Sequence, residues 1–246
     1  MACKKYLIVN ADDFGQSLGV NGGVIGAHES GIVTSASLMV RWPAAAEAAA
    51  DSRKQPKLSL GLHVDLGEWV YRDGTWIALY EVVPLDDINI VREEVARQLA
   101  TFYELVGKPP THIDSHQHVH LREPAHSILL DVARDLNIPL RHFSPGIRYC
   151  GSFYGQTAEG FPLPDAISVR SLLKILGALP DGVTELGCHP GEGNDLDTMY
   201  RSERAQELKI LCEPELPVTI STMGIELRSF GNLPDNCWQG CSDVLV

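Results

Sequence analysis

The sequence predicts an α/β protein, an irregular and TIM-barrel-like (β/α) barrel with about seven parallel strands. Short strand-like runs alternate with helix-like segments, and this alternation favours parallel strands joined by right-handed crossovers. The number of strands favours a closed or nearly closed sheet over an open one. A β/α barrel of 246 residues is usually a single unit, so residues 1–246 are treated as one domain.

The first half of the chain begins with an apolar run at 7–9, which fits a strand covered on both faces. A helix is expected at 20–30, because it contains recurring apolar residues and Gly31 is placed as its C-terminal stop. The next strand is expected at 33–40. Pro43 then opens an alanine-rich helix, since proline favours the first helical turn.

A third strand is expected at 58–64, followed by a segment, 66–84, that is rich in aromatic residues but lacks a helix or strand period. A loop of this length is usually functional, so the segment predicts a lid or a substrate wall. A locally packed Ω-loop is the alternative. Asp87 is expected to cap the next helix, in which apolar residues recur every three or four positions up to Gly107.

The second half of the chain continues the alternation of strands and helices. After the histidine-rich segment described below, the expected elements are a helix from Pro124, a strand at 139–143, an irregular segment to about 164, a helix at 168–179, a strand at 184–188, a helix at 203–211, a strand at 218–221 and a weaker strand pattern at 224–229. The tail from Gly231 is rich in turn residues, and no element is predicted there.

The segment 111–120 has the most unusual composition in the chain, T-H-I-D-S-H-Q-H-V-H. In an extended backbone, side chains two residues apart share a face, so its polar side chains would all lie together. Such a face needs partners for its polar atoms if it is buried, and a divalent cation is the simplest partner. A polar surface strand is the alternative. The residues concerned are His112, Asp114, His116, His118 and His120.

Other polar residues lie near the carboxyl ends of the predicted strands, where β/α barrels build their active sites. Asp12 and Asp13 follow the first strand, and His63 lies near the end of the third. Arg141 lies on the fifth, and His189 follows the sixth. Each has a structural alternative: the aspartates could cap a helix, His63 could be a hydrogen-bonded core residue, and Arg141 could form an ion pair. Their shared position favours a common site.

Charge and composition exclude several classes of partner. The formal net charge of −12 argues against nucleic acid and anionic membranes, because both require basic patches. No apolar run approaches the roughly 18 residues of a membrane-spanning helix, and the N-terminus does not have the pattern of a signal peptide. The six cysteines lack C-x-x-C pairs, so no zinc knuckle is predicted at Cys237 and Cys241, and a cytoplasmic protein with reduced thiols is expected. The sequence leaves a homodimer open.

Five blocks of sequence together resemble a known family, the YdjC-like carbohydrate deacetylases, which include chitooligosaccharide deacetylases. The resemblance implies an irregular β/α barrel and a metal-dependent hydrolase that removes N-acetyl groups from amino sugars, a small-molecule carbohydrate substrate. The blocks are N-A-D-D-F-G at 10–15, G-I-V-T-S-A-S-L-M at 31–39, G-L-H-V-D-L at 61–66, T-H-I-D-S-H-Q-H-V-H at 111–120 and E-L-G-C-H-P-G at 185–191.

The resemblance also implies roles for residues at matching positions. Asp13, His63 and His116 correspond to the ligands of one divalent metal ion, zinc or magnesium. The ion would lower the pKa of a water ligand and polarise the acetamide carbonyl. Asp12 corresponds to the general base that takes the proton of that water, and His189 to the general acid that protonates the departing amine.

Two further residues are expected to assist. Arg141 could orient or pair with the acidic base, and His118 could contact the substrate or replace His116 as a ligand. Two other functions are weighed against the deacetylase. A metal-dependent phosphoesterase on the same barrel would need more positive charge near the site. A non-catalytic sugar-binding protein that retains the metal would have no need of an intact Asp12.

Overall fold

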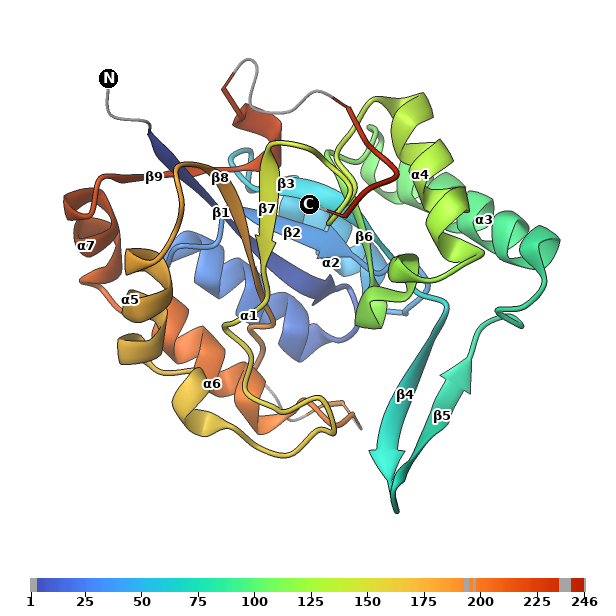
Figure 1. Ribbon diagram of the computed structural model, residues 1–246, viewed down its shortest axis with the longest axis horizontal. Coiled ribbons are helices and arrows are strands. Elements are labelled where there is room, and N and C mark those ends of the chain that lie inside the picture. The colour runs from blue at the N-terminus through green and yellow to red at the C-terminus, as the bar shows by residue number, and fades with distance from the viewer. Residues whose placement is uncertain (1–3, 193–194, 197, 235–239, 246) are drawn as a thin grey trace.

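A curled sheet of seven parallel strands forms the centre of the computed structural model (Figure 1), which describes residues 4–192, 195–196, 198–234 and 240–245. The strand order is β6-β3-β2-β1-β8-β7, and β9 pairs with the beginning of β1. The predicted TIM-barrel-like α/β class is confirmed, as an open half-barrel with β6 and β7 at its two ends. The strands of the sheet are β1 (Lys5–Phe14), β2 (Ser35–Leu38), β3 (Ser59–Val64), β6 (Ile113–Ser115), β7 (Ile147–Cys150), β8 (Gly182–Cys188) and β9 (Ile225–Arg228).

Helices cover the outside of the sheet. Along one face they pack in the order α4, α3, α2, α1, α6, which follows the order of the strands and is the arrangement that right-handed crossovers produce. The helices are α1 (Leu18–Glu29), α2 (Ala45–Ser52), α3 (Ile88–Val106), α4 (Ala125–Leu136), α5 (Val169–Gly177), α6 (Ser202–Leu211) and α7 (Leu216–Thr222), with 3₁₀ turns η1 (His116–Leu121), η2 (Pro164–Ala166) and η3 (Phe230–Asn232).

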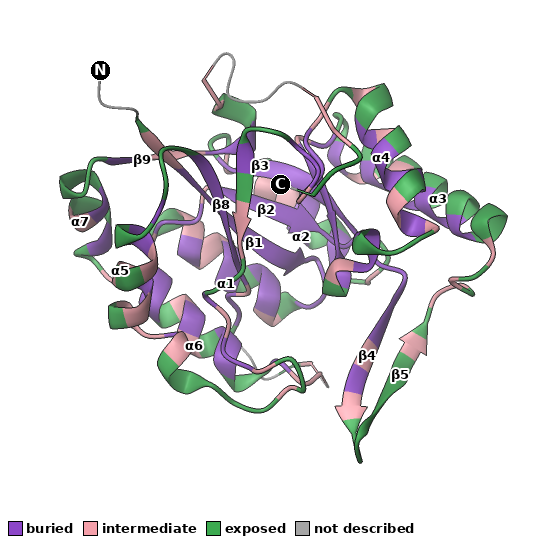
Figure 2. Ribbon diagram, in the orientation of Figure 1, coloured by how far each residue is buried: buried purple, intermediate pink, exposed green. Residues whose placement is uncertain are grey.

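β1 is the central strand, and Figure 2 shows it buried among its neighbours. It pairs with β8 over Lys5 to Ala11 and with β2 from Asn10 onward. The apolar run at 7–9 is therefore only its first half, because the strand continues through the polar residues that follow. This continuation places Asp12 and Asp13 inside the buried edge of the barrel.

The capping residues predicted for the longest helix are confirmed. The side chain of Asp87 accepts hydrogen bonds from the backbone N–H groups of Asn89 and Ile90 at the start of α3. Gly107 ends the helix in the left-handed region, with φ 77°. These local signals depend on nearby backbone groups alone, which explains why the sequence reveals them.

The prediction that 111–120 is one extended strand is wrong. Only Ile113–Ser115 forms β6, and the chain then turns into η1 (His116–Leu121). Gln117 and His118 have positive φ angles of 49° and 53°, so the backbone turns after His116. His112 and Asp114 stay on one face, where both bind Ser37, but the histidines after the turn leave the alternation of the strand. The alternation of polar residues in this part of the sequence therefore comes from a short strand followed by a turn, and does not mark one face of a long strand.

The aromatic segment 66–84 is not a loop. It forms an antiparallel hairpin of β4 (Gly67–Arg72) and β5 (Thr75–Glu81), which projects from the body of the molecule in Figure 1. Asp73 and Gly74 form its turn, with φ 50° and 83°. Two successive positive φ angles are typical of a type I′ hairpin turn, for which Asp-Gly is a preferred pair, and this was the signal in the sequence.

Three further predictions differ from the structure. The strand expected at 218–221 is part of α7, in which Leu216 and Ile220 lie four residues apart and are both buried, so packing outweighs the strand preference of the β-branched residues. The strand expected at 139–143 is reduced to a single bridge between Leu140 and Ile113. The segment expected to be irregular contains β7, which pairs with β8.

Cys241 and Ser242, near the C-terminus, contact the segment that follows α4. The backbone N–H of Ser242 donates to the carbonyl of Phe143, and the thiol of Cys241 lies 3.4 Å from the carbonyl oxygen of Ile138. The cysteines within the described residues are free thiols. Cys237, for which no zinc knuckle with Cys241 was predicted, lies outside the described residues. Within the described ranges, no helix combines the length and apolar character needed to cross a bilayer.

Candidate active site

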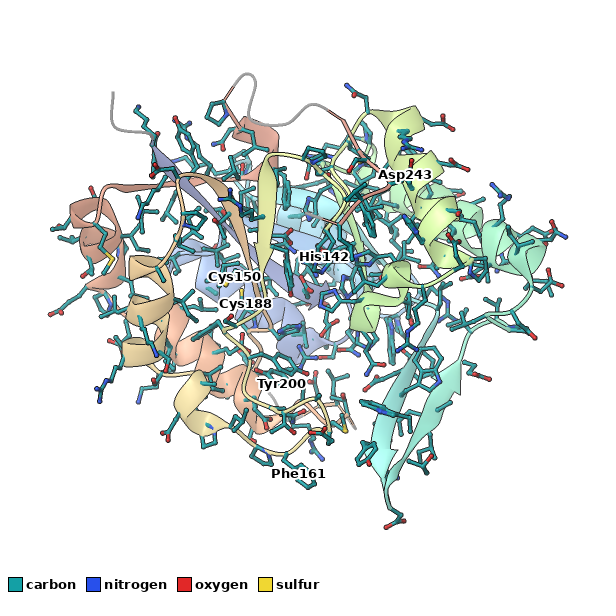
Figure 3. All side chains as sticks on the ribbon, viewed as in Figure 1. His142, Cys150, Phe161, Cys188, Tyr200 and Asp243 are labelled. Carbon is teal, nitrogen blue, oxygen red and sulfur yellow. The ribbon has the colours of Figure 1, made fainter. Side chains whose placement is uncertain are left out.

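A cavity of about 1100 Å³ opens at the carboxyl ends of the strands. Its floor includes Asp12, Asp13 and His63, and its walls include Trp69 and Trp76 of the β4–β5 hairpin. In Figure 3, Tyr200, which lines this cavity, lies on the same side of the molecule as the projecting hairpin. The cavity is large enough for a drug-sized or sugar-sized ligand.

Three of the predicted site residues meet at the cavity floor. Oδ1 of Asp13 lies 2.9 Å from Nδ1 of His116 and 3.2 Å from Nε2 of His63. Asp13 is the second-last residue of β1 and has a φ angle of 65°. His63 lies on β3, and His116 begins η1 directly after β6. Because β1 and β3 are parallel and β6 pairs with β3, the curl of the sheet brings residues about fifty and one hundred positions apart to one point.

The donor atoms of this group fit a divalent cation. Asp13, His63 and His116 each offer one ligand atom, and these atoms lie within 4.8 Å of one another. Nε2 of His116 is buried and has no hydrogen-bond partner among the described residues. Nδ1 of His63 lies 2.7 Å from Asp114, and such a contact fixes the tautomer of a ligating imidazole and leaves its other nitrogen directed at the ion.

The pKa values of Asp13 and His63 indicate that a cation could replace a proton in the group of Asp13, His63 and His116. Burial opposes its charge, but Arg204 and His116 hold the pKa of Asp13 well below its usual range. Burial likewise opposes the charge on His63, but Asp114 raises the pKa of the imidazole to about 9. A cation would therefore compete with a proton for His63, which makes binding dependent on pH.

Arg141 lies next to Asp12, as the sequence suggested. Its guanidinium forms a fork on the Asp12 carboxylate, with distances of 2.6 Å and 2.8 Å, and it also binds Asp114 and Glu185. Burial raises the pKa of Asp12, but the adjacent Arg141 outweighs this effect and lowers it. Asp12 is therefore ionised and rigidly oriented, and it is joined to β6 and β8 through one arginine.

His189 follows β8 directly, and its ring lies near Asp12. Its Nε2 is 3.9 Å from Oδ2 of Asp12, and its Nδ1 is 3.9 Å from Glu207 of α6. The backbone N–H of His189 donates to the other Glu207 oxygen at 2.5 Å. Burial lowers the pKa of His189 to about 4 and raises that of Glu207 to about 8. The imidazole is thus neutral and the neighbouring carboxyl readily protonated near pH 7.

His118 lines the cavity but is not brought into the Asp13 group. Its Nε2 lies 3.4 Å from the hydroxyl of Tyr149, and its ring makes edge contacts with His120 and His142. The turn at Gln117 and His118 directs it away from His116.

Several residues of the site were not predicted. Arg204 of α6 donates to Asp13 at 2.7 Å, and Glu68 of the hairpin lies 3.7 Å from Nε2 of His116. Glu185 was detectable in principle, as a carboxylate within the otherwise uncharged strand run G-V-T-E-L-G-C. Arg204 had no such signal, since it lies in a helix rich in charged residues, S-E-R-A-Q-E-L-K.

Comparison with known proteins agrees with this geometry. The family model described as YdjC-like protein matches residues 6–221, which is most of the chain. The chain belongs to the YdjC-like protein family. The resemblance carried by the five sequence blocks is thereby confirmed.

The alignments with named relatives extend over nearly the whole YdjC-like chain. It is 33% identical to a chitooligosaccharide deacetylase of Serratia marcescens, over 94% of this chain and 100% of that protein. It is 30% identical to a carbohydrate deacetylase of Geobacillus stearothermophilus, over 92% and 97%. Among solved structures, a putative cellobiose-phosphate cleavage protein from Enterococcus faecalis superposes with a TM-score of 0.73 at 25% identity, covering 93% of this chain and 98% of that one.

Proposed function

We propose that the protein is a metal-dependent hydrolase that removes the N-acetyl group from an amino sugar or a short N-acetylated oligosaccharide. The observation that carries the proposal is the meeting of Asp13, His63 and His116 on the cavity floor beside the second carboxylate, Asp12. The names of the relatives, chitooligosaccharide deacetylase and carbohydrate deacetylase, support the substrate class. Aromatic residues in the cavity wall suit the apolar faces of a sugar ring.

The cation would be held by Asp13, His63 and His116. One carboxylate and two imidazoles leave coordination positions open, which is the arrangement of catalytic rather than structural sites. A bound divalent ion would supply Lewis-acid polarisation of the acetamide carbonyl. The imidazole donors suit zinc, and the carboxylates of Asp13 and the neighbouring Glu68 also suit magnesium.

Asp12 serves as the general base in this proposal. Its fork to Arg141 keeps the carboxylate ionised and fixes its orientation toward the cavity. An ionised carboxylate at this place can accept the proton of the attacking water as the bond to the acetamide carbon forms. Arg141 thus acts through Asp12 and is a positioning residue.

His189 serves as the general acid that protonates the departing amine. The imidazole is neutral in the free site because burial lowers its pKa to about 4. Negative charge that develops on the acetamide oxygen would raise this pKa, because an opposite charge nearby favours the imidazolium. Glu207, 3.9 Å from Nδ1, is a proton carrier within reach of the same ring.

The test combines metal analysis with an assay of acetate release. Purified protein is expected to contain a metal ion whose binding is lost in Asp13→Ala, and to release acetate from a panel of N-acetylated mono- and oligosaccharides. Asp12→Asn should retain the metal but lose about 10²- to 10⁴-fold in turnover, the usual contribution of a general base. The exposed Asp243→Asn is the matched control and should behave as wild type.

Two outcomes would replace the proposal. Release of phosphate from phosphorylated sugars without acetate release would favour a phosphoesterase, although Arg141 and Arg204 in this region are already paired with carboxylates. Tight sugar binding with no chemistry, in wild type and in Asp12→Asn alike, would favour a sugar-binding protein. Full acetate release by Asp12→Asn would rule out Asp12 as the base.

A further inference from the structure

Three histidines without a role in the proposed deacetylation lie together beside the cavity. His118 and His120 come from η1, and His142 follows the Leu140 bridge. Each offers a ring nitrogen, and the three nitrogens lie within 4.8 Å of one another. We propose that His118, His120 and His142 form a second metal site, which binds a transition-metal ion of the zinc type. None of these residues belongs to the Asp13–His63–His116 group, so the two sites are separate.

The cluster contains buried nitrogens that lack partners. Nδ1 of His118 and Nε2 of His120 are both shielded from solvent and have no hydrogen-bond partner among the described residues. His120 itself is 0% exposed. A buried polar atom without a partner costs free energy, so two of them in one cluster indicate an absent partner. Ring packing does not remove this cost, because edge contacts between the rings leave the nitrogens unpaired.

Hydrogen bonding on the other side of His120 fits the role of a ligand. Its Nδ1 lies 2.6 Å from Oγ of Ser115. With Nδ1–H donating to this hydroxyl oxygen, the lone pair of His120 is on Nε2, the buried atom that has no hydrogen-bond partner among the described residues. Metal-ligating histidines almost always donate their other N–H to a nearby oxygen in this way.

The surroundings keep His120 and His142 neutral near pH 7. Burial lowers the pKa of His142 to about 4, and burial together with neighbouring rings lowers that of His120 well below its usual range. Neutral imidazole is the commonest protein ligand for transition metals. The nearest full positive charge, Arg141, is already opposed by Asp12, Asp114 and Glu185, so it does not repel an ion as an isolated guanidinium would.

The backbone holds the two outer ligands in a sparsely populated conformation. His118 and His142 have φ angles of 53° and 69°, in the left-handed region that costs free energy for residues other than glycine. Both turns direct rings from separate segments into one cluster. Figure 3 shows His142 between the C-terminal segment, marked by Asp243, and the end of β8, marked by Cys188. An ion here would tie η1, which begins with His116, to the segment that carries Arg141.

The ligand set determines which metal the site selects. Three imidazole nitrogens without a carboxylate favour zinc, cobalt, nickel or copper, and they disfavour magnesium, which prefers oxygen ligands. The Asp13 group contains a carboxylate and accepts either class. The two sites are therefore distinguishable by the metal they take as well as by the residues that hold it.

The experiment is a zinc titration of chelator-treated full-length protein, read by calorimetry and by metal analysis after gel filtration. Wild type should bind two zinc ions per chain. His142→Asn and, separately, His118→Asn should each bind one, because asparagine tolerates the left-handed conformation but removes the imidazole. His63→Ala should also bind one, and its remaining ion should resist an excess of magnesium.

A matched control is the neighbouring His126→Asn, whose ring stacks on Phe143 outside the cluster and which should bind two ions. Thermal unfolding of each variant checks that it is folded. A single zinc ion in wild type that both asparagine variants retain would overturn the proposal. Because stoichiometry is the readout, this result is separate from failure of the deacetylase proposal, which would leave two ions bound without acetate release.

Discussion

Arg141 lies among three buried carboxylates, those of Asp12, Asp114 and Glu185. One positive charge cannot neutralise three negative ones, and burial accordingly raises the pKa of Glu185 to about 7 despite the adjacent arginine. Glu185 is the member of the cluster that can hold a proton, while Asp12 stays ionised. A single side chain thus decides which carboxylate is available as a base.

Arg141→Lys should lower kcat for acetate release by about 100-fold, the effect of misplacing a catalytic group by about 1 Å. Lysine keeps the charge but cannot form the fork on Asp12, so the carboxylate loses its fixed orientation. Metal content and KM should stay near wild-type values. The exposed Arg148→Lys is the control. An unchanged kcat in Arg141→Lys would mean that Asp12 needs no positioning.

At the same scale, the sequence brought most of the candidate residues to notice but not their contacts. Polar residues after apolar strands drew attention to Asp12, Asp13, His63 and His189, and the structure brings these residues to one cavity. Their catalytic roles stay predictions. Arg204 lacked any signal, because a helical arginine looks like a surface residue until α6 is packed against α1 and its side chain meets Asp13.

At the scale of elements, the β4–β5 hairpin forms one wall of the cavity. Gln117 of η1 tethers it, since its side chain donates to the carbonyl of Trp69 at 2.8 Å and accepts from the same residue's N–H at 2.9 Å. Trp76 lines the cavity and is 51% exposed, with its ring against Tyr71 at 5.6 Å. A large aromatic that remains exposed at a cavity mouth is placed to contact a ligand.

Trp76→Ala should raise KM for the sugar by about 10-fold with little change in kcat, because the ring would bind ground state and transition state alike. Ile77→Ala, on the adjacent position of the hairpin and outside the cavity lining, should leave KM unchanged. Steady-state kinetics on a soluble N-acetylated oligosaccharide provide the measurement. A fall in kcat at constant KM would show that the hairpin acts on the reacting groups instead.

Helix α1 and the turn after His189 are in direct backbone contact at Gly23. A Cβ atom at this position would lie 2.3 Å from Cα of Gly191 and 2.9 Å from the carbonyl carbon of Pro190. The backbone atoms of Pro190 and Gly191 cannot move aside as easily as the end of a flexible side chain could. The absence of a side chain at Gly23 therefore fixes how closely the turn that carries His189 approaches the helix.

Gly23→Ala should reduce the free energy of unfolding by about 1–3 kcal/mol, as overpacking does, and should also reduce activity by moving His189. Gly26→Ala on the same helix is a sharp control. Its Cβ would meet only Leu208 at 3.8 Å, so it should be neutral or stabilising, since alanine favours a helix over glycine. Denaturant unfolding gives both values, and equal effects of the two substitutions would contradict the close contact.

At the scale of the whole molecule, the core includes a histidine held neutral. His112 is 1% exposed, stacks on Phe230 at 3.8 Å, and binds the hydroxyls of Ser37 and Thr111. Burial lowers its pKa to about 4. An unfolded histidine takes a proton near pH 6.5, so between pH 6.5 and 4 the unfolded state binds more protons than the folded state.

Stability should therefore fall as the pH drops through this window, and His112 should contribute about 3 kcal/mol of the loss, fully developed below pH 4. His112→Gln would lack this contribution, so the difference in unfolding free energy between wild type and variant should shrink as the pH falls from 7.5 to 4.5. Urea unfolding at several pH values measures it. A difference that is independent of pH would mean that His112 is not held neutral in the folded protein.

The sequence by itself determined the alternating order of strands and helices, the α/β class and the helix caps, because these depend on apolar period and on backbone groups a few residues away. It also determined the family, through five short blocks whose order along the chain matches that family. Tertiary structure decided the rest. Whether 111–120 extends or turns, whether 218–221 is strand or helix, and which charges meet Asp13 and Asp12 all depend on contacts between residues far apart in the chain. Local pattern carries no information on such contacts, since a segment takes the conformation that its buried partners stabilise most.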